Sequence, residues 1–84
     1  MMLTAELSLY PLREDYIPVI KAFIEEAAAQ ADITVITNAM STQLRGEWDA
    51  VFSAVSATLQ ASADRFGKQV LVCKFIPGAL DIEG

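Results

Sequence analysis

The sequence predicts one small α+β domain in which two helices cover one face of a four-stranded antiparallel sheet. The chain has 84 residues, which is enough for a single domain. Apolar residues alternate with polar ones in short segments, and they recur every three or four positions in two longer segments. The first pattern indicates strands and the second indicates helices, and the segments follow in the order β-α-β-β-α-β.

The first strand and the first helix are the clearest elements. Residues 3–10 are expected to form the strand, because leucine and alanine alternate there with polar residues and tyrosine. Residues 15–30 are expected to form the helix, with Asp15 as its N-cap. Pro18 then falls in the first turn, where its missing N–H costs little. The apolar stripe of this helix consists of Ile17, Ile20, Ile24, Ala27 and Ala28, with Phe23 beside it.

A hairpin, a long amphipathic helix and a last strand are expected next. Residues 32–37 and 40–45 form the two hairpin strands, and Gly46 ends the second of them. Gly67 is expected to stop the second helix, and residues 68–76 form the last strand. The apolar positions of the second helix are Trp48, Val51, Phe52, Val55, Leu59 and Phe66.

This element order, with right-handed crossovers, is typical of the ferredoxin-like fold. The first strand then lies in the middle of the sheet, with its leucine face against the helices and its polar face on the helix-free side. Val70, Val72 and Ile76 of the last strand are expected to share the helix-free face with Lys74. No linker, repeat or low-complexity segment interrupts the chain, so residues 1–84 are expected to form one domain.

Composition restricts the classes of partner. The net charge of −5 and the sequence pI near 4.4 disfavour nucleic-acid binding, because an acidic chain repels phosphate. The hydrophobic fraction of 54% is high for a small monomer, which predicts an apolar face that is covered by another subunit or used as a binding surface; a homodimer or homotetramer is expected. The N-terminus does not resemble a signal peptide and no segment could insert in a membrane, so a cytoplasmic protein is expected.

Residues that carry catalysis are scarce. The chain has no histidine, no metal-ligand spacing and no glycine-rich phosphate loop, so neither catalysis nor a metal or other cofactor is expected. Cys73 lies in an apolar segment and is expected to be a buried core residue. An enzyme would have to use Glu6, Lys74, Tyr10 or Cys73, and their spacing does not support one.

Polar side chains on two neighbouring strands are the candidate ligand site. They are Glu6, Ser8, Tyr10, Ser41 and Thr42, expected on or beside the helix-free face. Ser41 is favoured over Thr42 for direct contact, because Thr42 shares the core-facing parity of Met40 and Leu44. Plainer interpretations remain open. Glu6 either pairs with Lys74 or lies on a face that is simply hydrated. Ser41 and Thr42 are then ordinary strand residues with no ligand.

Four segments of the chain resemble the YkoF-type thiamine/hydroxymethylpyrimidine-binding proteins. They are residues 6–12 (ELSLYPL), 15–16 (DY), 38–47 (NAMSTQLRGE) and 67–75 (GKQVLVCKF). The resemblance covers nearly the whole chain and implies a ferredoxin-like fold, tight oligomers and binding of the thiamine pyrimidine. Some members carry two such domains, so this single domain would pair with a second copy to make the equivalent unit.

The resemblance implies non-catalytic binding of thiamine or its hydroxymethylpyrimidine moiety, in precursor transport, salvage or sensing. An aminopyrimidine is flat and suits a small pocket with an aromatic wall and a few fixed polar groups. Glu6 would accept from the amino group, Ser41 and Thr42 would donate to ring nitrogens, and Tyr10 or Trp48 would form the wall. The alternative is a structural or regulatory oligomer with no ligand, whose polar sheet face is buried between subunits; a small enzyme is a third possibility.

Overall fold

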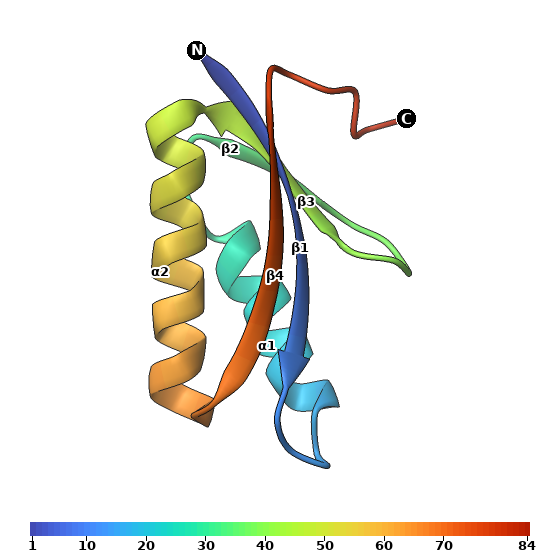
Figure 1. Cartoon of the computed structure of the whole chain (residues 1–84), viewed down its shortest axis with the longest axis vertical. Helices are drawn as coiled ribbons and strands as arrows, with labels where there is room; N and C mark the ends of the chain where they lie inside the picture. Colours follow the sequence, from blue (N-terminus) through green and yellow to red (C-terminus); the bar gives the residue numbers. More distant parts are fainter.

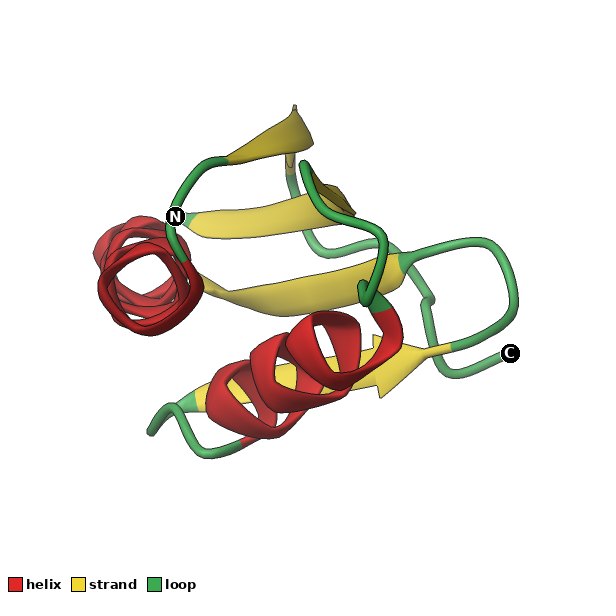
Figure 2. Ribbon diagram, turned by 90° about the horizontal axis from the view of Figure 1, so that it is seen from below, coloured by secondary structure: helices red, strands yellow, loops and turns green.

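A computed structural model describes residues 1–84 and contains six elements in the expected order (Figure 1). Neighbouring strands are antiparallel in the order β2-β3-β1-β4, and α2 is seen nearly end-on in Figure 2. The predicted ferredoxin-like fold is therefore confirmed. The elements are β1 (Met2–Pro11), α1 (Ile17–Ala28), β2 (Ile33–Thr37), β3 (Thr42–Glu47), α2 (Trp48–Phe66) and β4 (Gln69–Pro77).

The core lies between the sheet and the two helices, and its composition follows from the alternation of β1. Leu3, Ala5 and Leu7 are at most 2% exposed, because side chains at every second position of a strand point to the same face. The register places Ala5 beside Leu44 of β3, which is also fully buried. The remaining members of the buried cluster are Phe23 of α1 and Val51 and Ala54 of α2.

The first helix differs from the prediction at its start and in its buried face. It begins at Ile17 after Tyr16, with no side-chain cap, so the prediction of Asp15 as N-cap is wrong. Pro18 occupies the first turn, and its fixed φ suits a helix start without a capping side chain. The fully buried residues are Val19, Phe23 and Ala27, whereas Ile17 is 54% exposed. The stripe is rotated because Phe23 fills the core and leaves the isoleucines on the flank.

The third strand is shifted by two residues from its predicted position. Gly46 lies inside β3, where an added Cβ would come within 3.0 Å of Ile33 Cγ2, so this glycine permits close approach of β2. Residues 39–41 belong to the turn instead, and Met40 is 85% exposed, so its predicted core-facing position is wrong. Asn38 Oδ1 accepts from the N–H groups of Met40 and Ser41 at 2.8 and 3.2 Å, which stabilises this turn.

The helix-free face has the expected strand partners but an additional cover. Glu6 lies between Gln43 of β3 and Lys74 of β4. Thr4 is only 2% exposed, because the segment after β4 lies against it. The Thr4 hydroxyl donates to the Gly78 carbonyl at 2.8 Å and accepts from the Leu80 N–H at 3.0 Å. Only the part of this face beyond Thr4 is therefore open.

Candidate functional site

The C-terminal half of β1 extends beyond its neighbour β3. Pairing between β1 and β3 ends at Leu7 and Thr42, whereas pairing between β1 and β4 continues to Pro11 and Gln69. One edge of β1 is therefore open from residue 8 onward. The helix α1 and the turn between β2 and β3 stand on either side of this open edge.

A cavity of about 220 Å³ occupies the space at the open edge. The strand β1 contributes Leu7–Tyr10, α1 contributes Ile20, Phe23 and Ile24, and residues 37–42 of the hairpin close the remaining side. The volume is below the roughly 300–1,000 Å³ of pockets for drug-sized ligands, so it suits a single small ring. Apolar side chains from α1 and polar groups from the hairpin meet there, which suits a flat heterocycle.

Four of the five predicted site residues line this cavity. Ser8 and Tyr10 reach it from β1, and Ser41 and Thr42 reach it from the hairpin. Thr42 is buried on the side of the core, as its parity predicts, and its hydroxyl is hydrogen-bonded to that of Thr37 at 3.1 Å. Glu6 is not among the lining residues, since it lies on the helix-free face. The cavity is therefore beside the helix-free face and not on it.

Glu6 is linked to the cavity through Ser41. The Ser41 hydroxyl donates to Glu6 Oε2 at 2.9 Å and accepts from Gln43 Nε2 at 2.6 Å. Glu6 Oε1 also lies 3.6 Å from Lys74 Nζ, so the ion pair that the sequence left open as an alternative is present. The Lys74 side chain is 71% exposed, and an ion pair this exposed contributes only ~0–1 kcal/mol. The chain of contacts thus fixes the direction of the Ser41 hydroxyl.

Several cavity residues were missed in the sequence, and one candidate lies elsewhere. Ile20 and Ile24 form one wall, although the sequence pattern assigns them to the core stripe. Leu9 was likewise assigned only to the core face. Its place at an open edge follows from the different lengths of β1 and β3, which propensity alone does not define. Trp48 lies at the other end of β1, where its backbone N–H donates to the Met1 carbonyl at 2.9 Å. It does not line the cavity.

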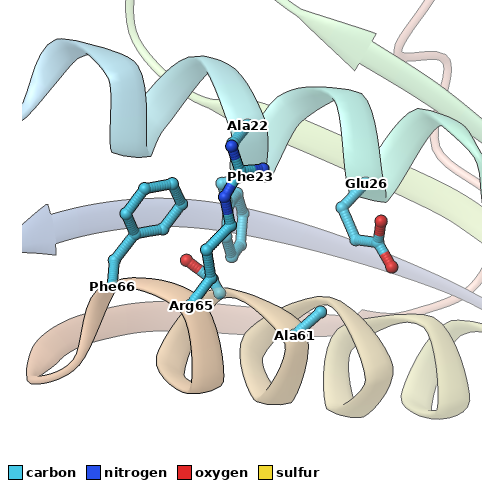
Figure 3. Close-up of a pocket in the computed structure, with 7 residues that line it drawn as sticks. Ala22, Phe23, Glu26, Ala61, Arg65 and Phe66 are labelled. Carbon is cyan, nitrogen blue, oxygen red and sulfur yellow. The ribbon is translucent and has the colours of Figure 1, made fainter.

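A second, smaller cavity of about 100 Å³ lies between the two helices (Figure 3). Glu26 of α1 and Arg65 of α2 are on its rim, and the Arg65 guanidinium lies 4.8 Å from the centre of the Phe66 ring. None of the predicted site residues lines it. With about half the volume of the first cavity, it is the poorer candidate for a ring-binding site.

The remaining chemistry of the chain lies outside both cavities. Cys73 is half-buried on the helix side of β4 and packs against the core cluster, less deeply than expected because β4 is an edge strand. Burial raises the pKa of the Cys73 thiol above 9.0, so the thiol is protonated at neutral pH.

No group of three or more His, Cys, Asp or Glu residues is arranged to hold a metal ion. Neither helix is long and apolar enough to cross a membrane.

The sequence of this chain matches a known protein family, and its fold matches several solved structures. The model of the YKOF-related family matches residues 2–76. No curated protein sequence matches the chain. A crystal structure of a Streptococcus pneumoniae protein has a TM-score of 0.86 at 22% identity, covering 99% of this chain and 94% of that one.

Two further solved structures share the fold. A proposed thiamine biosynthesis/salvage protein of Thermotoga maritima has a TM-score of 0.83 at 20% identity, covering 99% of this chain and 92% of that one. A Methanocaldococcus jannascii protein has a TM-score of 0.79 at 26% identity, covering 98% and 89%. These likenesses extend over nearly the full length of each chain, so the whole fold is shared.

Proposed function

This chain belongs to the YkoF-related family, and we propose that it binds thiamine or its hydroxymethylpyrimidine moiety without transforming it. The observation that carries the proposal is the cavity at the open edge of β1, which gathers Ser8 and Tyr10 from β1 and Ser41 and Thr42 from the hairpin. The fold is also that of the Thermotoga maritima protein proposed to act in thiamine biosynthesis or salvage. Such binding would serve transport, salvage or sensing of a thiamine precursor.

The proposed pose places the pyrimidine ring between polar and apolar walls. Ile20 and Ile24 would contact one face of the ring, and Tyr10 would contact the opposite face. Because the Ser41 hydroxyl already donates to Glu6, its free lone pair would accept from the ligand amino group. Ser41 thus takes the acceptor role that the sequence suggested for Glu6, and Glu6 acts as the residue that orients Ser41.

A binding role without catalysis is supported by the chemistry of the lining. The lining residues include no carboxylate, amine or thiol. Ser41 is the one lining hydroxyl that donates to a carboxylate, and we assign that carboxylate, Glu6, an orienting role because it is also paired with Lys74. Cys73 is absent from the lining and its raised pKa keeps it a poor nucleophile. We therefore propose that no reaction takes place at the site and that no further cofactor is required.

We also propose that the protein is a homodimer or homotetramer. Val70, Val72 and Ile76 are 47%, 44% and 40% exposed, and they share the open part of the helix-free face and its rim. Apolar side chains in such a row favour burial against a second copy of the chain. The same row supports the alternative function, a structural or regulatory oligomer that binds no small molecule.

A thermal-shift screen separates the two functions. Thiamine and hydroxymethylpyrimidine should raise the melting temperature, by ~10 °C or more at concentrations of about 100 times Kd. The thiazole half of thiamine alone, amino acids and nucleotides serve as controls and should have no effect. Stabilisation by none of the pyrimidines would reject the proposed ligand and favour the structural oligomer.

A further inference from the structure

The backbone hydrogen bonds at the ends of the sheet show which residues of β1 face β4. In an antiparallel sheet, the N–H and C=O of one residue point to the same neighbouring strand, and successive residues alternate between neighbours. The Gly78 N–H donates to the Met2 carbonyl at 2.9 Å, and the Leu12 N–H donates to the Lys68 carbonyl at 3.4 Å. The even-numbered residues of β1 therefore bond with β4.

The odd-numbered residues of β1 face β3 by the same rule. The Trp48 N–H donates to the Met1 carbonyl at 2.9 Å, and the β1–β3 pairs continue as far as Leu7 and Thr42. Leu9 comes next, and its N–H and C=O point toward the position that β3 would occupy if it were two residues longer. The edge there is open.

No residue of the hairpin turn replaces the missing strand partner of Leu9. Continuation of the register would bring Met40 opposite Leu9, but Met40 is in the turn and its N–H donates to Asn38 Oδ1 at 2.8 Å. No hydrogen bond joins Leu9 to residues 38–41. Leu9 is half-buried and lines the cavity, so its backbone donor and acceptor face the cavity without partners. Backbone groups in such surroundings are normally hydrogen-bonded.

We propose that the N–H and C=O of Leu9 recognise the ligand as a missing strand would, through a donor next to an acceptor on a planar ring. The amino group and the adjacent ring nitrogen of an aminopyrimidine form such a pair: the amino group donates to the carbonyl, and the nitrogen accepts from the N–H. The inference rests on the proposed function for the identity of the ring. Leu9 is then a specificity-determining residue that acts through its backbone, independently of its side chain.

This mode of recognition also defines how the ring lies. A ring bonded to a strand edge lies roughly in the plane of the sheet, as the next strand would. One of its faces then meets Ile20 and Ile24 of α1, which cover the helix side of the cavity. The opposite face is directed toward the side chains of Ser8 and Tyr10, which have the parity of the helix-free side. The apolar wall and the backbone pair are therefore compatible with one ring position.

Amide hydrogen exchange measured by NMR on the full chain tests this assignment. Without ligand, the Leu9 amide should exchange much faster than the amides of Ser8 and Tyr10, which bond to β4, and of Leu7, which bonds to β3. Saturating hydroxymethylpyrimidine or thiamine should slow exchange at Leu9 by about tenfold or more and leave the flanking amides unchanged. A Leu9 amide as slow as that of Leu7 in the free protein would overturn the proposal.

Two variants provide a matched comparison. Leu9→Pro removes the N–H without removing a sheet hydrogen bond, since proline is tolerated at an open edge, and Leu9→Ala removes the side chain but keeps the N–H. Calorimetry should show pyrimidine affinity about tenfold weaker for Leu9→Pro than for Leu9→Ala. Equal affinities of two folded variants, or saturation of the wild type without slower exchange at Leu9, would overturn this inference alone. Failure of both probes to bind the wild type would overturn the proposed function with it.

Discussion

Among single residues, Ser41 and Glu6 are coupled by a hydrogen bond and should affect binding together. The Ser41 hydroxyl is within the cavity lining, whereas the Glu6 carboxylate is outside it and accepts that hydroxyl at 2.9 Å. Sequence alternation correctly placed Glu6 on the polar face of β1. It could not show that Ser41 stands between Glu6 and the cavity, because that contact depends on the turn geometry set by Asn38.

Ser41→Ala should weaken pyrimidine binding more than Glu6→Gln. A net hydrogen bond is worth ~0.5–1.5 kcal/mol, so the loss at Ser41 corresponds to roughly two- to tenfold in affinity. Glu6→Gln retains an oxygen that can orient Ser41 and should have a smaller effect. The double variant should lose little more than Ser41→Ala, because the two residues share one contact. Calorimetry on the four proteins measures this coupling, and additive losses would argue for separate ligand contacts.

Lys74→Met is the control for the charge on Glu6. The ion pair is largely exposed, so its removal should change the free energy of unfolding by only ~0–1 kcal/mol and leave pyrimidine affinity unchanged. Chemical denaturation and calorimetry measure the two quantities. A large loss of affinity in Lys74→Met would show that the lysine, and not Ser41, determines how Glu6 acts.

Cys73 should behave as a protonated thiol that the function does not use. Its folded pKa is raised by burial, so alkylation at neutral pH should be slower in the native protein than in urea. Unfolding exposes a thiol that ionises at lower pH. The contribution of Cys73 to the free energy of unfolding is therefore constant well below pH 9.0. It decreases as the pH rises from about 9.0 toward the higher pKa of the folded state. Cys73→Ala should remove this pH dependence and keep pyrimidine binding; a loss of binding would contradict the assignment.

At the scale of elements, β1 was predictable because apolar and polar residues alternate along it with a period of two. The alternation of β1 fixed which side chains meet the helices, and the buried residues Leu3, Ala5 and Leu7 agree with it. The helix α1 was less determined, since it carries apolar residues around much of its circumference. Phe23 packs in the core, and Val19 and Ala27, one turn away on either side, are therefore buried with it. The isoleucines left over from the core then form the apolar wall of the cavity.

Glycine was the other ambiguous signal at this scale. Gly67 does stop α2, with φ of 86° and its N–H donating to the Ala63 carbonyl at 2.9 Å. Gly46 was expected to act in the same way but lies within β3, because the constraint at this position comes from β2. The distance between adjacent strands is a tertiary property, and a sequence read along one element does not reveal it.

Gly46→Ala should destabilise the hairpin and the cavity wall that it supports. The new Cβ would lie 3.0 Å from Ile33 Cγ2 and 3.1 Å from the Asp32 carbonyl oxygen, so β2 would have to move. Strain of this kind costs ~1–3 kcal/mol in the free energy of unfolding. Ser53→Ala, on the exposed side of α2, is the control and should remain within ~0.5 kcal/mol of the wild type. Urea denaturation that ranks the two variants equally would contradict the close approach.

At the scale of the whole molecule, the segment after β4 limits which part of the helix-free face is available. Residues 78–80 bury Thr4, and Arg45 donates to the Leu80 carbonyl at 3.0 Å and pairs with Glu83. This cover could not be predicted from the sequence, because residues 78–80 have no regular periodicity. The row of Val70, Val72 and Ile76 remains at least 40% exposed, which leaves it available to a second copy.

Light scattering at micromolar concentration should therefore show a dimer or a larger homo-oligomer. Val72→Glu places a charge in the middle of the apolar row, opposite Ser8, and should shift the protein toward the monomer without unfolding it. Circular dichroism verifies the fold of the variant, and Val55→Ala, on α2, controls for general loss of apolar area. A monomeric wild type would remove the proposed interface.

Chemical-shift mapping with hydroxymethylpyrimidine tests most directly the proposal that the cavity at the open edge of β1 binds the pyrimidine ring. Saturable shifts are expected at residues 8–10 and 37–42 and at Ile20 and Ile24. The amides around Arg65 and Phe66 in the second cavity should not shift. Saturable shifts confined to the second cavity or to the β4 side of the helix-free face, with residues 8–10 and 37–42 unchanged, would contradict it.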